Sequence, residues 1–285
     1  MKNVFQKIFG LLSSGAIYRL ASFVMSCLNK CIPVGENTFL MVEGHKMYPG
    51  TFDRYIAAFL WKKGMLESFE ADILKCRLKE GMTVLDIGAN IGRYTLMMAE
   101  GAGDSGKVIA FEPDRDLCAI LKRNVEANNL RNVEISSNAI GDKNGEVVLS
   151  RNRGNRGDNT ICSNEMGMGE GETVECVTLD TFLPQGTKID LIKMDIQGAE
   201  AMAFAGMKRV LNESAGIVVL AELTPSITGS SGYDVISLVK EFINSYGFKV
   251  SYIDEKEKRL IPVNLAELEK MCEGGKGVNI CMEKV

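Results

Sequence analysis

Val84-Leu85-Asp86-Ile87-Gly88-Ala89-Asn90-Ile91-Gly92 is the part of the sequence that most clearly indicates the fold. It begins as a buried strand and predicts a tight turn into a helix. Gly88 lets the turn form without a Cβ, Asn90 tolerates a left-handed backbone, and Gly92 lets the helix begin close to the sheet. Open α/β sheets bind ligands at such a turn, beyond the carboxyl end of a strand.

The spacing of these glycines argues against two common kinds of nucleotide-binding loop. A dinucleotide fingerprint requires G-x-G-x-x-G, but here three residues separate Gly88 from Gly92 and Asn90 stands where the middle glycine would be. A P-loop would require Gly-Lys-Ser/Thr, which does not follow. A turn with only a structural role would not need Asp86 at the strand end, because a buried carboxylate needs a polar partner. Glu112, in Phe111-Glu112-Pro113, ends the next strand and is placed to bind both ribose hydroxyls, so the two motifs together predict a nucleoside site.

Short apolar runs alternate with helical patterns along the rest of the chain. We expect strands at 38–42, 83–87, 107–111, 133–137, 145–150, 173–178, 189–194, 216–221, 248–253 and 278–282, and helices at 53–75, 91–100, 114–128, 199–211, 233–246 and 264–272. Strands that are apolar nearly throughout and are followed by helices predict an α/β fold with a parallel sheet covered on both faces. The last two strands are expected to form an antiparallel edge. The glycine-, asparagine- and arginine-rich residues 151–171 form a variable loop, which is typical of a functional lid or a mobile insert.

The amino-acid composition argues against several classes of protein and of functional site. The chain has 285 residues, of which 46% are hydrophobic and 25% charged, so global disorder and a multi-span membrane protein are excluded. A net charge of −4 shows no basic excess, and we expect no nucleic-acid partner. His45 is the single histidine, which argues against a histidine-rich zinc site. Eight cysteines without a C-x-x-C motif favour reduced thiols and a cytoplasmic location.

The N-terminal residues 1–50 form a separate predicted unit. Apolar residues from Phe5 to Cys27 recur at helical spacing, with Lys2, Lys7, Arg19 and Lys30 between them, which predicts an amphipathic helix. We favour a helix that packs on its own domain or on a partner subunit. Contact of residues 1–30 with a membrane surface is the alternative.

The motifs resemble the FkbM family of S-adenosylmethionine-dependent methyltransferases. The resemblance covers roughly residues 44–285 and is carried by Asp86-Ile87-Gly88-Ala89-Asn90-Ile91-Gly92, Phe111-Glu112-Pro113, Asn138-Ala139-Ile140-Gly141-Asp142, Leu179-Asp180 and Ile192-Lys193-Met194-Asp195-Ile196-Gln197-Gly198-Ala199-Glu200. It implies a class I methyltransferase domain over residues 51–285, with a Rossmann-like sheet of strand order 3-2-1-4-5-7-6 and strand 7 antiparallel.

The resemblance also implies where S-adenosylmethionine binds. Asp86, Gly88, Asn90 and Gly92 would surround its methionine part. Glu112 would hold the ribose, while Asn138 and Ala139 would lie by the adenine. Glu70 is expected to close over the site.

Four charged residues near the ends of the fourth and fifth strands are candidates for catalysis. Lys193 and Asp195 share one face of the strand by period two, Glu200 lies in the first turn of the next helix, and Glu222 ends the fifth strand. We predict that Asp195 positions the acceptor or removes its proton, with Lys193, Glu200 and Glu222 in second rank. In the alternative reading Asp195 and Glu200 only cap the helix and Lys193 pairs with one of them. A magnesium ion on Asp195 and Glu222 ranks below a metal-free site.

The predicted function is therefore S-adenosylmethionine-dependent O-methylation of a hydroxyl on a sugar, glycan, lipid or secondary metabolite, with the acceptor atom taken from the resemblance. Arg151, Arg153 and Arg156 are expected either to meet an anionic acceptor or to lie in a solvated loop. A nicotinamide-dependent oxidoreductase and a non-catalytic nucleoside-binding module are the alternatives.

Overall fold

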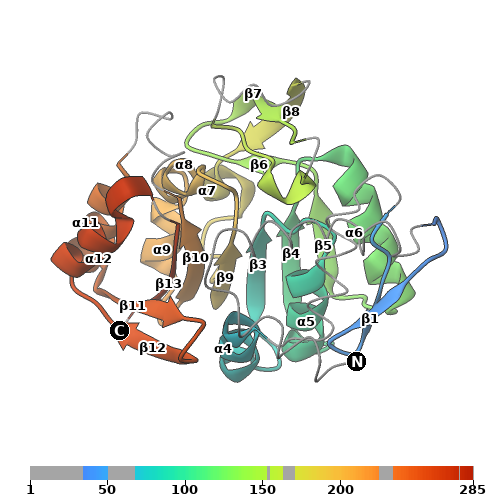
Figure 1. Cartoon of the computed structure of the whole chain (residues 1–285), viewed down its shortest axis with the longest axis horizontal. Helices are drawn as coiled ribbons and strands as arrows, with labels where there is room; N and C mark the ends of the chain where they lie inside the picture. Colours follow the sequence, from blue (N-terminus) through green and yellow to red (C-terminus); the bar gives the residue numbers. More distant parts are fainter. Residues whose placement is uncertain are drawn as a thin grey trace, which may run out of the picture.

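The computed structural model describes residues 35–50, 68–152, 155–162, 171–224, 234–275 and 277–284. In these ranges the chain forms an eight-stranded central sheet, a three-stranded sheet and a two-stranded hairpin, together with helices (Figure 1). The helix predicted within residues 1–31 and most of the helix predicted at 53–75 lie outside the described residues. Over the same ranges, none of the helices is long and apolar enough to cross a bilayer.

The central sheet has the strand order β12-β11-β13-β10-β9-β3-β4-β5. Its strands are β3 (Thr83–Ile87), β4 (Lys107–Phe111), β5 (Val133–Ser136), β9 (Leu191–Met194), β10 (Val218–Leu223), β11 (Phe248–Asp254), β12 (Arg259–Pro262) and β13 (Val278–Lys284). Parallel pairs join β5, β4, β3, β9 and β10, whereas β13 runs antiparallel to both β10 and β11. Without β12 this is the order 3-2-1-4-5-7-6 with strand 7 antiparallel, so the predicted α/β fold is confirmed.

The helices of the described ranges cover both faces of this sheet. They are α4 (Phe69–Arg77), α5 (Arg93–Ala102), α6 (Arg115–Ala127), α7 (Leu179–Phe182), α8 (Glu200–Ala205), α9 (Lys208–Glu213), α11 (Val235–Tyr246) and α12 (Leu265–Cys272). Alternate strand residues point to opposite faces. Val84 and Leu191 pack with α4 and α5, whereas their neighbours Leu85 and Ile192 pack with α8, α9, α11 and α12. The core is therefore a helix–sheet–helix sandwich.

Several elements differ from those predicted: the short elements at 45–47, 139–140 and 179–182 were not expected, and two larger differences affect the central sheet and its helices. The helix expected at 199–211 is divided into α8 and α9, which end and begin at the capping residues Gly206 and Met207. Gly206 packs closely there, since a Cβ would lie 2.0 Å from the carbonyl oxygen of Gly141. Strand β12 was not predicted. It pairs with β11 at the edge of the sheet, where its terminal Pro262 is tolerated because an edge strand does not need every N–H.

The second sheet contains β6 (Ala139–Ile140), β7 (Gly145–Ser150) and β8 (Gly171–Val177) in the order β6-β8-β7. β7 and β8 pair antiparallel along their whole length, which confirms the two strands predicted on either side of the variable loop. Figure 1 shows this sheet at the top, above the ends of β3, β4 and β5. The hairpin consists of β1 (Leu40–Val42) and β2 (His45–Met47).

The packing of the core lets us predict how much stability is lost when one buried aromatic ring is removed. Phe204 of α8 is fully buried, and its ring packs edge-on against Phe242 of α11 with 5.1 Å between centroids. Phe204→Ala should lower the free energy of unfolding by about 3–5 kcal/mol through lost burial and the cavity left behind, as measured by urea denaturation. Phe39→Ala is the control, because Phe39 is 46% exposed and its loss should cost about 1 kcal/mol or less. Equal losses in the two variants would contradict this account of the core.

Candidate functional site

A cavity of about 310 Å³ opens at the carboxyl ends of β3, β4 and β9. Its walls come from the segments that follow these strands, from the start of α5 and from the loop before β8. The residues that line it are 86–91, 93–94, 111–113, 138–140, 149, 155–161, 193, 195–197 and 199. Open α/β sheets bind ligands at this edge, so the cavity is the candidate site.

The loop after β3 is held tightly against the end of β9. Gly88 has a φ of +84°, and a Cβ there would lie 2.0 Å from the carbonyl oxygen of Asp195. Asn90 has a φ of +52°, as its predicted left-handed tolerance requires. Gly92 begins α5 at a φ of +94°, where a Cβ would meet Leu121, and it is not among the cavity-lining residues. Gly88 and Asn90 therefore border the cavity, while Gly92 provides the left-handed backbone at the start of α5.

Glu112 lines the part of the cavity that was predicted to hold the nucleoside. Its Oε2 accepts the N–H of Asn90 at 2.8 Å and its Oε1 accepts the N–H of Asp114 at 2.9 Å. Burial raises the pKa of Glu112 to about 8, against the effect of these two donors. Asn138 and Ala139 line the same part of the cavity, and the Ser136 hydroxyl orients the Asn138 amide by donating to its Oδ1 at 2.7 Å. The structure thus brings together the residues predicted to hold the ribose and adenine.

Asp86 and Lys193 face each other on neighbouring strands. They are register partners on β3 and β9, and both side chains are buried. The Thr95 hydroxyl donates to Asp86 Oδ2 at 2.5 Å, and burial raises the pKa of Asp86 to about 6. Lys193 Nζ lies 3.4 Å from Glu70 Oε1. Burial lowers the pKa of Lys193, but the carboxylates of Glu70 and Asp195 outweigh burial and raise it above its ordinary value.

Asp195 stands at the end of β9 and lines the cavity. The side-chain amide of Gln197 donates to Asp195 Oδ1 at 2.8 Å, which fixes the orientation of the carboxylate. The backbone N–H of Asp195 donates to the carbonyl of Ile87 at 3.0 Å. The predicted pair Asp195 and Lys193 therefore reaches the cavity from one strand.

The other two predicted catalytic residues do not line the cavity. Glu200 Oε1 accepts the N–H of Gly198 at 3.0 Å and Glu200 Oε2 accepts the Thr224 hydroxyl at 3.1 Å, so this carboxyl group closes the start of its own helix. Burial raises the pKa of both Glu200 and Glu222 to about 7, and the nearby Asp195 carboxylate adds to the shift. Over the described ranges, no group of three or more His, Cys, Asp and Glu side chains is placed to hold a metal ion.

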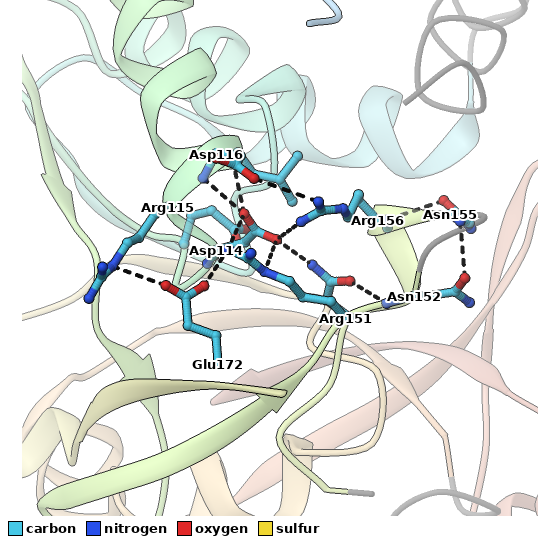
Figure 2. Close-up of polar contacts among 12 residues, drawn as sticks. Asp114, Arg115, Asp116, Arg151, Asn152, Asn155, Arg156 and Glu172 are labelled. Atoms are coloured by element: carbon cyan, nitrogen blue, oxygen red, sulfur yellow. Dashed lines mark hydrogen bonds and ion pairs between the residues drawn. The ribbon is translucent and has the colours of Figure 1, made fainter. Parts of the chain in front are cut away.

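The segment 155–161, part of the variable loop predicted to be a functional lid or a mobile insert, forms a wall of the cavity. Figure 2 shows it attached to Asp114, the N-cap of α6, whose carboxylate is fully buried. Arg151 Nε and Arg156 Nη1 lie 3.1 and 2.6 Å from Asp114 Oδ2, and the amide of Asn159 donates to the same oxygen at 2.9 Å. Arg151 also pairs with Glu172 of β8.

Arg151 and Arg156 were expected either to meet an anionic acceptor or to lie in a solvated loop. Both pair with Asp114, so they do not lie in a solvated loop, and Arg156 also lines the cavity. Arg153 lies outside the described residues. The N-cap role of Asp114 is readable from the sequence, whereas its partners, 37 and 42 residues away, are not.

Comparison with known proteins identifies the family model that fits this chain. The model described as "Methyltransferase FkbM domain" matches residues 86–250. A protein-L-isoaspartate O-methyltransferase of Thermotoga maritima is 41% identical over 56 residues, which cover 20% of this chain and 18% of that protein. A "Methyltransferase 1" of Beauveria bassiana is 24% identical over 144 residues, covering 44% of this chain and 57% of the relative. Both matches span less than two thirds of the relative's length.

The solved structures give a more distant likeness. The crystal structure of an rRNA methylase from Streptococcus thermophilus aligns with a TM-score of 0.44 and 12% identity. The alignment covers 76% of this chain and 94% of the other.

The contacts of Asp114 lead us to expect that replacing Asp114 destabilises the fold more than replacing its neighbour Asp116. Asp114→Asn removes a fully buried charge that pairs with two arginines, and we expect the free energy of unfolding to fall by about 2–3 kcal/mol. Asp116→Asn is the matched control, because Asp116 is 49% exposed and lies 3.6 Å from Arg156, so its loss should cost about 0.5 kcal/mol or less. Chemical denaturation measures both, and an Asp114 variant as stable as the control would show that the cluster contributes no stability.

Proposed function

The chain belongs to the FkbM family of S-adenosylmethionine-dependent methyltransferases, and from this premise we propose that it methylates a hydroxyl oxygen of a sugar, glycan, lipid or secondary metabolite. One observation carries the proposal. The Gly88 loop, the Glu112 carboxyl and the Asp195 carboxylate border a single cavity of about 310 Å³ at the carboxyl edge of the sheet. In the proposal, the side formed after β3 and β4 binds the nucleoside, and Asp195, after the neighbouring strand β9, faces the second substrate.

The cavity residues suit the nucleoside part of S-adenosylmethionine. In the proposal, Glu112 accepts hydrogen bonds from the ribose hydroxyls, and Asn138 and Ala139 lie beside the adenine. The raised pKa of Glu112, about 8, reflects the cost of burying its charge, and hydroxyl donors would offset part of that cost. Gly88 and Asn90 leave backbone against which the cofactor can lie.

Asp195 is the residue that we assign to the acceptor. When bound, S-adenosylmethionine supplies a methyl group on a sulfonium, whose departure leaves a neutral thioether. The protein's task is then to align the acceptor oxygen and to exclude water. Asp195, held by Gln197, can accept the hydroxyl proton as the new bond forms, and a histidine is not needed. His45 Nε2 lies 3.3 Å from Glu100 Oε2, and His45 is not a cavity-lining residue.

The proposal includes a cytoplasmic location and excludes a nucleic-acid acceptor. A net charge of −4 supports the second point. The described cysteines Cys76, Cys118, Cys162, Cys176, Cys272 and Cys281 are free thiols, which supports a reducing compartment.

A binding and turnover experiment tests the proposal against its two alternatives. Calorimetry should detect S-adenosylmethionine and S-adenosylhomocysteine but not NADH. Binding of NADH alone would favour an oxidoreductase. Cofactor binding without methyl transfer to any of a pool of hydroxylated acceptors would favour a non-catalytic nucleoside-binding module.

Glu112→Ala should weaken S-adenosylhomocysteine binding by about 1–3 kcal/mol, because it removes charged hydrogen bonds to the ribose. Isothermal titration calorimetry measures the change. Glu134→Ala is the matched control, since Glu134 is half exposed on β5 and pairs with Lys107 at 2.7 Å, away from the cavity. Unchanged affinity in the Glu112 variant would remove this residue from the site.

Asp195→Asn should keep cofactor affinity and lower turnover by roughly 100-fold or more, because an amide cannot take the acceptor proton. Steady-state rates with an identified acceptor, combined with calorimetry, separate the two effects. Asp72→Asn, on α4 and paired only loosely with Lys258 at 3.8 Å, is the control. Full activity in the Asp195 variant would reduce this residue to a structural role.

A further inference from the structure

The β1–β2 hairpin exposes apolar side chains on its outer side. The segment that contains β1, Phe39-Leu40-Met41-Val42, is apolar at every position, although a strand with one side in water usually alternates apolar and polar residues. Leu40 and Val42 pack against the core, whereas Phe39 is 46% exposed and Met41 is 58% exposed. In the described ranges the other large hydrophobic residue that is exposed is Val148 on β7. Scattered exposed apolar residues are ordinary, but two on one side of a short strand indicate a contact surface.

Two cations stand beside these apolar side chains. Lys46 is the register partner of Met41 on β2, and its Nζ lies 4.4 Å from the centre of the Phe39 ring and 5.2 Å from that of Tyr48. Arg123 of α6 lies on the Tyr48 ring, with its Cζ 3.7 Å from the ring centre. A hydrogen bond from Lys46, together with the charges of Lys46 and Arg123, lowers the pKa of Tyr48 against the effect of burial. These five residues, Phe39, Met41, Lys46, Tyr48 and Arg123, form what we call the hairpin face.

The groups around the hairpin face leave it positive. Arg123 donates to the backbone carbonyl of Glu36 and, at 3.1 Å, to the side-chain oxygen of Asn37, and both acceptors are neutral groups. Glu43, in the turn between β1 and β2, has a side chain that is only 5% exposed and pairs with Arg93 at 2.8 Å. The charge of Glu43 is therefore matched inside the protein.

Positive charge is concentrated at this end of the chain. Residues 1–50 contain five Lys and Arg against two Asp and Glu, whereas residues 51–285 contain 28 against 35. The part before the described hairpin, residues 1–34, has four Lys and Arg and no Asp or Glu. A charge asymmetry of this kind within one chain is typical of a protein that meets an anionic surface.

The sign of the charge and the apolar side chains together select the partner. Residues 1–34 of the same chain carry the same sign as the hairpin face, and a second copy docked face to face would bring the same cations together. A nucleic-acid backbone would attract the cations but would leave Phe39 and Met41 against phosphates. A bilayer with anionic headgroups offers negative charge for the cations and an apolar interior for the other two side chains.

We propose that the hairpin face binds the surface of an anionic lipid bilayer, with Phe39 and Met41 inserted below the headgroups and Lys46 and Arg123 among them. The basic residues of 1–34 add attraction of the same sign. Figure 1 shows the hairpin at the right-hand edge of the molecule. None of the five residues lines the cavity, so this surface does not depend on the proposed function. The cytoplasmic leaflet is anionic, which agrees with the proposed cytoplasmic location.

Co-sedimentation of the full chain with lipid vesicles tests the proposal. Phosphatidylcholine vesicles with about a third phosphatidylserine should bind at least about tenfold more tightly than vesicles of phosphatidylcholine alone, and added salt should reduce the difference. Replacing both apolar residues, Phe39→Ser with Met41→Ser, should weaken binding to the anionic vesicles at least about tenfold, because apolar burial is lost. Lys46→Gln should weaken it about fivefold.

Two exposed residues elsewhere on the molecule provide matched controls. Val148→Ser changes an apolar residue that is 49% exposed on β7, at the top of Figure 1. Lys249→Gln removes an exposed cation on β11, on the left of the same view. Both control variants should bind the anionic vesicles as wild type does. Urea denaturation of each variant checks that its fold is retained.

Every other outcome overturns the proposal in a recognisable way. Wild type that binds neither kind of vesicle, or both equally, contradicts an anionic bilayer as the partner. Anionic-vesicle binding that the hairpin variants retain moves the lipid contact away from this face. A dimer in sedimentation velocity that the double variant abolishes, without vesicle binding, assigns the face to a second copy. A double variant much less stable to urea than the Val148 control, again without vesicle binding, assigns it to the chain's own N-terminal residues.

Discussion

The contact between the backbones of Gly88 and Asp195 is the constraint on which the site depends. A Cβ at Gly88 would lie 2.0 Å from the carbonyl oxygen of Asp195 and 2.9 Å from its carbonyl carbon, so no side chain fits there. The N–H of Asp195 completes the contact by donating to Ile87. Because the ends of β3 and β9 are held this close, the loop after one strand and the carboxylate after the other border the same cavity. The glycine is thus required by the packing of two strand ends, before any ligand is considered.

Burial of charge is the second constraint, and it is concentrated around the cavity. Asp86, Glu112 and Lys193 are all buried, and withdrawing such groups from water costs several kcal/mol per ion unless partners compensate. The partners are present: a threonine hydroxyl for Asp86, two backbone N–H groups for Glu112 and a carboxylate for Lys193. The pKa values of Asp86 and Glu112 are nevertheless raised to about 6 and about 8, so compensation is incomplete. Charges kept at a cost to stability, and grouped on one cavity, are typical of a functional site.

The sequence predicted those features that depend on local pattern. β3 and β4 were predicted to the residue, because each is a short apolar run between turn signals. Lys193 and Asp195 reach the cavity together because period two places them on one face of a strand. Glu200 was predicted at the same edge, but its carboxyl group turns back to the N–H of Gly198, a competition that spacing alone does not resolve. The segment 155–161 has no periodicity, and its position depends on ion pairs with Asp114 that only the folded chain brings together.

Asp114 also connects two walls of the cavity. Its N–H donates to Glu112, whose other oxygen accepts the N–H of Asn90, and its carboxylate binds Arg156 and Asn159. A continuous set of hydrogen bonds therefore joins the loop after β3 to the segment 155–161 through the residue assigned to the ribose. Each carboxylate oxygen has two lone pairs, so Glu112 can accept ribose hydroxyls without releasing the backbone donors. Since the segment over the cavity is already held by the protein's own contacts, a ligand that binds there does not bear the entropy cost of ordering it.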